Sequence, residues 1–349
     1  MIDVLVVGGG PAGLATAILA TQAGLKVTVA EPRGTPVDKA CGEGLMPAAV
    51  ARLRALGVEP AGHVLRGIRY LDVNHQVDGL FHGQTGLGVR RTVLHAALAE
   101  RAMDLGIPVV PVRVTEFEQS RGHVTAAGIQ ARYLVGADGL HSVIRRACGL
   151  EPAPARHIRF GLRRHYRVRP WTDLVEVHWS ADSEAYVTPV ADDLVGVAVL
   201  GPAGPGSGHG RGHEGFDERL TAFPALYKLL TEAEPVGAVR GAGPLRQDVR
   251  RRGSSNVLLV GDASGYIDAL TGEGISVALA QAAALVECLK ADRAADYEHE
   301  WRRVSRKPGL LTAGLLRARH TPGIGRLIVP AAARLPRVFT AVVNQVASG

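Results

Sequence analysis

Three glycines near the start of the chain have the spacing that lets a polypeptide backbone approach a phosphate group closely. They follow the pattern G-x-G-x-x-G and are Gly8, Gly10 and Gly13. The pattern follows the apolar run Ile2–Val7, expected to be a buried strand, and opens a helix expected over Pro11–Ala23. The first glycine permits a tight turn, the second admits a pyrophosphate and the third allows close packing of helix on strand. The helix start at Pro11 and Ala12 adds free N–H groups and a positive dipole end, so the segment predicts a dinucleotide site.

The second expected strand, Lys26–Glu31, ends on an acidic residue, and a basic residue follows in the next loop. Glu31 lies about 20 residues after the last glycine, where a carboxylate suits the two hydroxyls of a ribose. Arg33 follows in the loop, where it either lies against an adenine ring or is solvated. This strand–helix–strand unit therefore predicts the beginning of a Rossmann-like sheet.

Two later segments also end a buried strand on an acidic residue. The first is Leu134–Gly139, which closes with Asp138 and Gly139, and the second is Val257–Val260 followed by Asp262. Ligands of open α/β sheets bind at the carboxyl ends of the strands, so both acids are placed for a ligand. The Asp262 carboxylate suits a hydrogen bond from a sugar-alcohol hydroxyl.

Two glycines precede a long Ala-rich helix expected over Ile275–Ala291. Gly272, Gly274 and Ile275 can direct backbone N–H groups at an anion or at an oxyanion that develops during a reaction. A reduced flavin carries such a charge along one edge of its ring. The glycine segment, the Asp138 segment and this segment, in this order, predict that the cofactor is FAD.

The remaining runs are typical of an antiparallel sheet and a few helices. The expected strands are Gly161–Val168, Val175–Trp179, Glu184–Val190, Leu194–Leu200 and Val236–Arg246, with a hairpin of Val64–Val73 and Val77–His82. A helix is expected over Thr92–Leu105 and a strand over Val109–Gln119, and the chain after Ala291 is expected to be helical, punctuated by prolines. Because the cofactor segments interrupt the antiparallel runs, we expect a discontinuous cofactor domain with an inserted substrate domain and a helical tail. The expected ranges are 1–60, 90–155 and 250–305 for the cofactor domain, 61–89 and 156–249 for the substrate domain, and 306–349 for the tail.

Composition narrows the class of protein. The chain has 349 residues, 46% of them hydrophobic and 21% charged, which suits an enzyme of two domains. It has no apolar run of about 18–20 residues and no basic segment before Ile2–Val7, so neither a membrane span nor a signal peptide is expected. Its three cysteines are Cys41, Cys148 and Cys288, too scattered for a disulfide framework or a zinc site. A cytoplasmic location is expected.

The basic charge is concentrated at one end. Residues 301–349 contain nine Lys and Arg residues and no Asp or Glu, so the first 300 residues carry −2 of the net charge of +7. One interpretation is a helical tail whose arginines face water or pair with the acidic body. The alternatives are an acidic partner, a coenzyme phosphate or a peripheral membrane contact. Nucleic acid is not expected, because the chain has no interleaved aromatics and no nucleic-acid module motif.

In their order, the three cofactor segments resemble those of the para-hydroxybenzoate-hydroxylase-like flavoproteins. That superfamily includes class A flavin monooxygenases, geranylgeranyl-reductase-type enzymes and flavin-dependent halogenases. The resemblance implies an α/β FAD-binding domain of glutathione-reductase type, interrupted by an antiparallel-sheet substrate domain and followed by a helical tail. It implies FAD bound by the three glycines and Glu31, with Asp138 at the pyrophosphate and Asp262 at the ribityl chain. It also implies that Arg91 contacts FAD and that the backbone of Val114, in a strand Val112–Thr115, meets adenine, while NAD(P)H binds transiently as the reductant.

The loop Cys41–Leu45 resembles the C-G-x-G-L loop of the geranylgeranyl-reductase branch, which lies beside the flavin ring. Gly42 would then contact the cofactor. Cys41 would either tune or protonate a reacting group or be a small packed residue. Glu43 would be an acid/base group, a contact of the flavin edge or a solvated loop residue.

The segment Tyr186–Pro189 departs from two branches of the superfamily. The halogenases carry Trp-x-Trp-x-Ile-Pro, which is absent, so halogenation is not expected. The reductases carry Tyr-x-Trp-x-Phe-Pro, of which Tyr186 and Pro189 are present but the bulky aromatics between them are not. This difference weakens the transfer of a prenyl-reductase activity to this chain.

The resemblance implies an FAD-dependent monooxygenase that uses NAD(P)H and O₂. Through a flavin C4a-hydroperoxide it would hydroxylate or epoxidise an apolar or aromatic, polyketide- or isoprenoid-like small molecule. The alternative is a geranylgeranyl-reductase-type reductase of prenyl double bonds, and a third interpretation is a flavin-binding protein without turnover. The catalytic candidates are Cys41, Glu43 and Tyr186, and the strand residues His178 and Trp179 are further pocket candidates. No metal site is expected, since His209 and His213 lack a carboxylate or cysteine partner.

Overall fold

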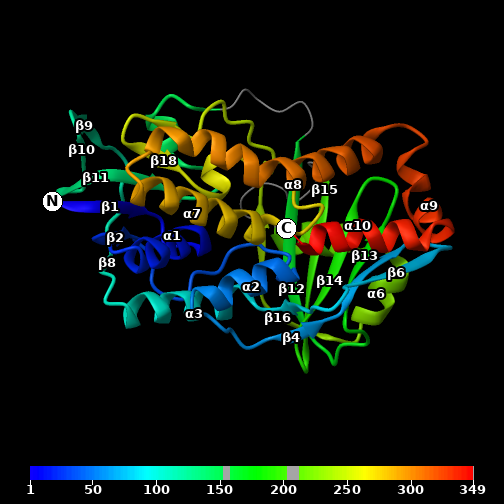
Figure 1. Ribbon diagram of the computed structural model, residues 1–349. Helices are drawn as coiled ribbons and strands as arrows, with labels where there is room; N and C mark the ends of the chain where they lie inside the picture. The colour runs from blue at the N-terminus through cyan, green and yellow to red at the C-terminus, as the bar shows by residue number, and fades with distance from the viewer. Residues whose placement is uncertain (152–157, 203–211, 349) are drawn as a thin grey trace.

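The computed structural model describes residues 1–151, 158–202 and 212–348. Two sheets lie side by side, the cofactor sheet near the N-terminus and the substrate sheet beyond it (Figure 1). The long helix α8 (Tyr297–His320) extends from one to the other. An α/β fold with two sheets and C-terminal helices confirms the predicted fold class.

The cofactor sheet has eight strands in the order β17-β18-β11-β1-β2-β8, with the hairpin β9-β10 attached to β11. Its central pairs, from β18 to β8, are parallel. The strands are β1 (Ile2–Val7), β2 (Val27–Ala30), β8 (Val109–Val110), β9 (Glu118–Ser120), β10 (His123–Ala126), β11 (Ile129–Gly136), β17 (Gly253–Ser254) and β18 (Val257–Leu259). Segments distant in sequence therefore become neighbours with their carboxyl ends at one edge.

Both faces of this sheet are buried, as expected for parallel strands. Along β1, Val4 and Val6 face one core while Leu5 and Val7 face another, because successive side chains of a strand alternate. Helices α1 (Pro11–Gln22), α3 (Arg91–Asp104) and α7 (Gly274–Lys290) contribute to the first core. Helices α2 (Pro47–Ala55) and α4 (Val143–Ala147) complete this half of the molecule.

The substrate sheet has seven strands in the order β16-β12-β15-β14-β13-β5-β6. It is antiparallel, as predicted, except for the parallel pair β13–β5. The strands are β5 (Gly67–Leu71), β6 (Gln76–Leu80), β12 (Arg159–Arg167), β13 (Leu174–Trp179), β14 (Glu184–Ala191), β15 (Leu194–Pro202) and β16 (Glu234–Ala242). A third, small sheet consists of β3 (Gly44–Leu45), β7 (Gly86–Gly88) and β4 (His63–Leu65), in that order.

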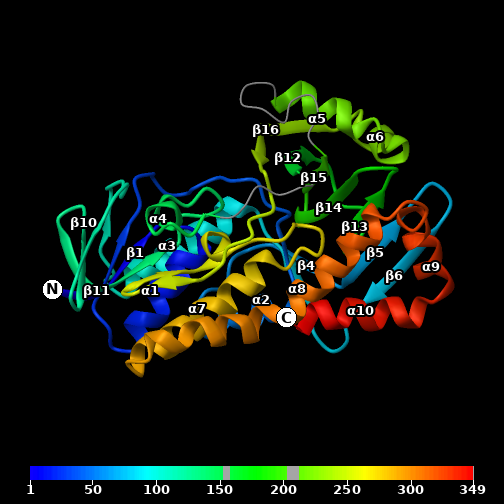
Figure 2. The same ribbon diagram turned by 90° about the horizontal axis from the view of Figure 1, so that it is seen from above.

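The two faces of the substrate sheet are covered by different parts of the chain (Figure 2). Helices α5 (Gly212–Leu220) and α6 (Pro224–Leu230) pack on one face through Phe216 and Leu226. The end of α8, together with α9 (Ile328–Arg334) and α10 (Pro336–Ser348), packs on the other through Phe339 and Val343. The C-terminal helices therefore share a hydrophobic core with the substrate sheet.

Two local expectations were wrong. The strand expected over Val109–Gln119 is only the short β8 and β9, with no strand over 111–117, so Val114 is not in a strand. Pro111 lacks the N–H that a continued ladder would need. Pro308 does not interrupt the tail but lies buried inside α8, where packing outweighs the lost backbone hydrogen bond. Of the two histidines considered for a metal, His209 lies outside the described residues.

Candidate active site

A cavity of about 900 Å³ lies between the two sheets and contains most of the predicted site residues. Those that line it are Gly10, Pro11, Ala12, Cys41, Gly42, Glu43, Arg91, Asp138, Gly139, Tyr186, Asp262, Gly272, Gly274 and Ile275. Those that do not line it are Gly8, Gly13, Glu31, Arg33 and Val114. The structure thus brings segments that are far apart in the sequence to one cavity.

The glycine segment fits a dinucleotide for steric reasons. A Cβ on Gly13 would lie 1.9 Å from the carbonyl oxygen of Gly8, so only glycine lets α1 approach β1 this closely. Gly8 has φ +107°, a backbone conformation that residues with a side chain rarely adopt. A Cβ on Gly10 would instead meet no atom nearer than Arg91 Nη2 at 3.8 Å, which leaves space on the cavity side.

Two helices begin at the cavity near the glycine segment, and neither has a side-chain cap at its N-terminus. The N-cap of α1 is Gly10 and that of α7 is Glu273, and neither makes a capping hydrogen bond. Their unpaired N–H groups and positive dipole ends are available to an anionic ligand. Uncapped helix starts beside cavity-lining glycines fit the pyrophosphate and the flavin edge of FAD.

Glu31 organises the glycine turn rather than lining the cavity. Its buried carboxylate accepts a hydrogen bond from the Gly9 N–H at 2.9 Å and from Arg33 Nε at 2.7 Å. Burial would raise the pKa of this carboxyl, but the hydrogen bonds from Arg33 and Gly9 lower it overall. On the other side of the turn, the His95 ring donates to the Gly9 carbonyl at 2.8 Å, a contact that the sequence analysis missed. Arg33 is thus paired with Glu31.

The two strand-end acids differ in their freedom to bind a ligand. Asp138 accepts hydrogen bonds from Ser142 Oγ at 2.5 Å and from the Val143 N–H at 2.7 Å, so its carboxylate caps α4. The Asp262 carboxylate receives no hydrogen bond among the described residues and lies in the cavity wall. Burial raises the pKa of Asp262, although the charges of Lys39 and Arg91 oppose the shift. Asp262 is therefore the acid open to a ligand hydroxyl.

Glu43 is buried, not solvated, with only 2% of its surface exposed. One carboxylate oxygen accepts the N–H of Arg91 at 2.8 Å, and the other lies 2.6 Å from His165 Nε2 on β12. Arg163 Nη1 lies 3.0 Å from His165 Nδ1. Because a guanidinium can only donate, Nδ1 accepts and Nε2 carries the proton that is donated to Glu43.

This chain of contacts continues to the surface and links the Cys41–Leu45 loop to the substrate sheet. Arg163 also pairs with Asp38, which receives a second hydrogen bond from Arg240 Nε at 2.9 Å. The Cys41–Leu45 loop is thereby held against strands β12 and β16. Sequence reasoning missed His165 and Arg163, whose only signal was charge inside an otherwise apolar strand.

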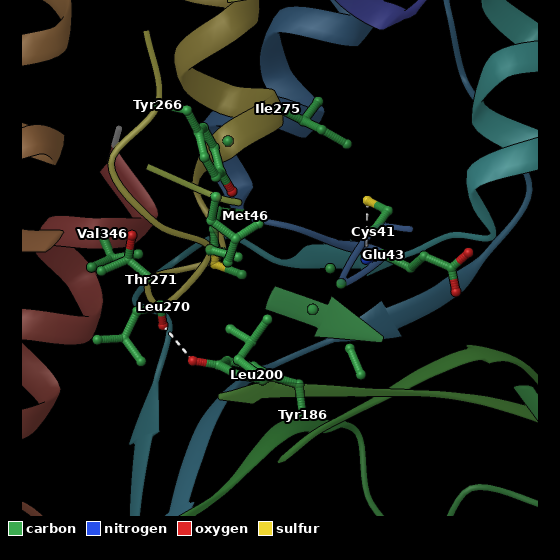
Figure 3. A pocket seen from close by; sticks show the side chains of 18 of the residues that line it. Cys41, Glu43, Met46, Tyr186, Leu200, Tyr266, Leu270, Thr271, Ile275 and Val346 are labelled. Atoms are coloured by element: carbon green, nitrogen blue, oxygen red, sulfur yellow. Dashed lines mark hydrogen bonds between the residues drawn. The ribbon is translucent and has the colours of Figure 1, made fainter. Parts of the chain in front are cut away.

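Cys41 lies in the cavity wall next to this network (Figure 3). Its Sγ accepts the N–H of Glu43 at 3.4 Å. Burial raises the pKa of the Cys41 thiol and the nearby Glu43 adds to the shift, although the Arg91 charge opposes it. The thiol therefore stays protonated at neutral pH and is not poised as a nucleophilic thiolate.

Tyr186 also lines the cavity, and its hydroxyl donates a hydrogen bond to the Leu270 carbonyl at 2.7 Å (Figure 3). Burial raises the pKa of Tyr186 well above its usual value. The hydroxyl thus holds the loop that leads into α7.

The other strand candidates lie outside the cavity: His178 pairs with Glu176 at 3.2 Å, and Trp179 packs on Tyr70 at 5.3 Å between ring centres. Neither lines the pocket as expected: alternation along β13 directs His178 to the other face, and Trp179, on the face of Val175 and Val177, packs on Tyr70 instead.

A buried network of charges lies behind the same loop. Arg159 Nη2 is 2.6 Å from Glu184, and Arg159 Nε is 3.0 Å from Asp268. Arg319 of α8 pairs with the second oxygen of Glu184. These contacts connect β12, β14, the loop before α7 and α8, and none of them was expected from the sequence. Tyr266, in the same loop, is a further cavity residue that sequence reasoning passed over.

The far end of the cavity is apolar. One wall comes from the substrate sheet, through Ile68, Val175, Val177, Ala198 and Leu200. The opposite wall comes from the C-terminal helices, through Leu311, Leu315, Ile328, Ala332, Phe339, Val343 and Val346. The cavity therefore joins a polar end built for a dinucleotide to a hydrocarbon-like compartment.

The fold and the site define an FAD-dependent oxidoreductase, and comparison with known proteins agrees. Residues 1–294 match the family described as FAD binding domain, and the chain belongs to that family. The family expected from the three sequence segments is thus confirmed.

Several proteins of similar sequence are reductases. The menaquinone reductase of Mycolicibacterium smegmatis is 30% identical over 335 residues, which cover 86% of this chain and 79% of that protein. The digeranylgeranylglycerophospholipid reductase of Methanococcus vannielii is 27% identical over 302 residues, covering 79% of this chain and 74% of that protein.

Solved structures share the fold at lower identity. The flavin-dependent brominase Bmp2 superposes with a TM-score of 0.85 at 17% identity, covering 99% of this chain and 93% of its own. A flavoprotein/dehydrogenase from Cytophaga hutchinsonii superposes with a TM-score of 0.82 at 18% identity, with the same coverage. At these identities the likeness establishes the fold alone.

Proposed function

We propose that this protein is an FAD-dependent reductase that saturates a carbon–carbon double bond of an isoprenoid chain. The observation that carries the proposal is the apolar half of the cavity, which begins at the flavin-side loop and is walled by β-strands and C-terminal helices. A compartment of this composition favours a hydrocarbon chain over a polar substrate, because burial of apolar surface supplies the binding energy.

The names of the similar proteins support the same substrate class. Menaquinone and digeranylgeranylglycerophospholipid, the molecules in those names, both carry isoprenoid chains. Oxygen insertion, the first expectation from the sequence, stays an untested prediction, since the halogenase likeness concerns the fold. The Tyr186–Pro189 departure is compatible with a reductase because Tyr186 acts here through its hydroxyl on the Leu270 carbonyl.

Residues of the polar end would hold the cofactor, with the starts of α1 and α7 toward its anionic groups and Asp262 toward a hydroxyl. Bound FAD, reduced by NAD(P)H, supplies the hydride for such a reaction. The apolar walls place the chain and exclude water. The second carbon of the alkene needs a proton, and the protonated thiol of Cys41 is a donor at this end of the cavity.

An anaerobic single-turnover experiment tests the proposal. Photoreduced enzyme is mixed with menaquinone or with a geranylgeranyl lipid, and flavin absorbance and product mass are followed. The expected result is flavin reoxidation without O₂ and a product whose isoprenoid chain has gained two hydrogens. Fragmentation locates the gain after any quinol has been reoxidised to the quinone. No reoxidation without O₂, together with a product that gains an oxygen atom when O₂ is admitted, would contradict it and favour the monooxygenase.

A further inference from the structure

Several side chains of the C-terminal helices line the cavity and are also exposed on the molecular surface. Leu310 of α8 is 63% exposed, Leu335 before α10 is 57% exposed and Val338 of α10 is 56% exposed, and all three line the cavity. Leu335, Val338 and Val342 recur along one side of α10, while Phe339 and Val343 on another side pack into the core. These residues form an apolar rim where the cavity reaches the surface between α8 and α10.

The surface around this rim is also apolar and basic. Ile324 and Leu327, which lie between α8 and α9 and do not line the cavity, are 48% and 57% exposed. Four exposed arginines make no ion pair among the described residues: Arg317, Arg326, Arg334 and Arg337. In contrast, Arg302 and Arg303 near the start of α8 pair with Glu298 and Glu300. Some tail arginines therefore pair with the body, whereas these four face water.

We propose that this surface docks on an anionic phospholipid bilayer and that the isoprenoid chain enters the cavity from the bilayer. The docking face is defined as the rim (Leu310, Leu335, Val338 and Val342), the apolar pair Ile324 and Leu327, and the four unpaired arginines. This inference rests on the proposed function for the identity of the chain that enters. The docking itself rests on the surface alone.

Two observations select a bilayer as the occupant. The first is charge, because residues 301–349 contain no Asp or Glu, and their exposed arginines alternate along the sequence with exposed aliphatic residues. This composition suits anionic headgroups above an acyl layer. The second is continuity, because the same aliphatic residues lead into the apolar compartment. Large exposed hydrophobic residues of the cofactor domain, such as Met103, are not part of such a basic, cavity-bearing surface.

The shape of the region fits a helix pair that lies on a membrane. No single helix among the described residues is long and apolar enough to span a bilayer. The segments Gly325–Arg334 and Pro336–Ser348 reach that length and hydropathy only when taken together, and they are bent by 107° relative to each other. Because α10 also packs on β6, the pair is anchored to the protein on one side and free to meet lipid on the other.

Cosedimentation with vesicles tests the docking. The full chain with bound FAD is mixed with vesicles of phosphatidylcholine alone and with vesicles that also contain phosphatidylglycerol. Two variants are compared with the wild type: R326Q/R334Q/R337Q, and I324S/L327S, whose residues do not line the cavity. The controls are R113Q/R121Q and V73S/M103S, which change exposed arginines and exposed large hydrophobic residues elsewhere on the surface.

Wild-type protein is expected to partition onto the anionic vesicles at least about tenfold more than onto the neutral ones, since three or more arginines meet the charged surface. The arginine variant should lose this preference, the I324S/L327S variant should bind both vesicles less, and the controls should bind as wild type does. Equal partitioning of wild type and both variants, or binding that requires a protein partner or a second copy in place of lipid, would overturn the proposal.

The outcome for docking is separable from the outcome for the reaction. Reduction of a short-chain isoprenoid in detergent, without vesicles, is measured for the same variants and is expected to be unchanged. Vesicle binding with no reduction of any isoprenoid contradicts the proposed reductase and leaves the docking supported. Reduction in detergent without vesicle binding contradicts the docking alone. Truncation of the tail is not a suitable test, because Phe339 and Val343 belong to the core of the substrate domain.

Discussion

The two ends of the cavity are built in different ways. The cofactor end is formed largely by backbone groups, at glycines and at uncapped helix N-termini. Each of these features comes from a few residues that are adjacent in the sequence. The substrate end is made of side chains, contributed by strands in the middle of the chain and by helices at its very end. A ligand with fixed charge needs a few N–H groups at fixed positions, whereas an apolar chain needs only a dry, shaped wall. The first kind of site leaves a motif in the sequence and the second does not.

The largest expected effect is the loss of FAD affinity when the cofactor end of the cavity is blocked and the substrate end is left unchanged. In Gly10→Trp the indole fills the space that the glycine leaves toward Arg91 and the cavity. FAD affinity should fall at least about 100-fold, which corresponds to about 2.7 kcal/mol. Retention of FAD through gel filtration, measured by flavin absorbance against protein, checks the result.

Two controls make this test specific. Gly34→Ala, at a glycine with no atom within 4 Å of an added Cβ, should keep FAD. Ala198→Leu, in the apolar wall, should also keep FAD but raise the KM for a long isoprenoid. Loss of FAD in Ala198→Leu would show that the two ends are not independent. Full retention of FAD in Gly10→Trp would show that Gly10 does not face the cofactor.

The second prediction concerns the loss of folding stability caused by a buried carboxyl group at the cofactor end. Glu273, between the glycines at the start of α7, has a buried oxygen without a partner, and burial raises its pKa from 4.5 to about 7. The folded state therefore holds this proton more tightly than the unfolded state, so this group's contribution to stability falls as pH rises from about 4.5 to about 7. Glu273→Gln removes the ionisation and should raise the free energy of unfolding by up to about 3 kcal/mol above pH 7.

Urea unfolding at about pH 4.5 and about pH 8 measures this effect. The gain should be absent at the lower pH, where the carboxyl is protonated in both states. Glu116→Gln, at an exposed position, serves as the control and should change stability at neither pH. An equal gain at both pH values would show that the charge of Glu273 is not the cause.

The third and smallest prediction concerns the contact that holds the two ends together. His165→Leu leaves the buried carboxylate of Glu43 and the guanidinium of Arg163 each short of a partner. The variant should lose about 1–3 kcal/mol of stability and slow turnover, because the Cys41 loop is no longer held against β12. His165→Gln, which can donate to Glu43 and accept from Arg163, should recover part of both.

A double-mutant cycle with Glu43→Gln identifies the interaction itself. If the hydrogen bond between His165 and Glu43 carries the effect, the two substitutions should show a coupling energy above about 0.5 kcal/mol in urea unfolding. Independent effects that simply add would mean that His165 acts through packing alone.

The sequence predicted the cofactor end well because its chemistry is local. Gly8, Gly10 and Gly13 act within one strand–turn–helix unit, and the structure supplies the steric reason for each. Prediction failed where a residue had more than one local explanation. Glu43 was as consistent with a solvated loop as with a buried ligand, and the strand around Val114 depended on pairing that Pro111 prevents.

Sequence by itself determined the strand ends, the helix starts and the acidic residues that can meet an FAD, because backbone conformation and helix termini follow from nearby residues. Only the tertiary structure decided their partners. It paired Glu43 with His165, 122 residues away, gave the Asp138 carboxylate to a helix cap while leaving Asp262 open, and turned the basic tail into a wall of the cavity. Such contacts depend on which faces are buried together, and no short stretch of sequence carries that information.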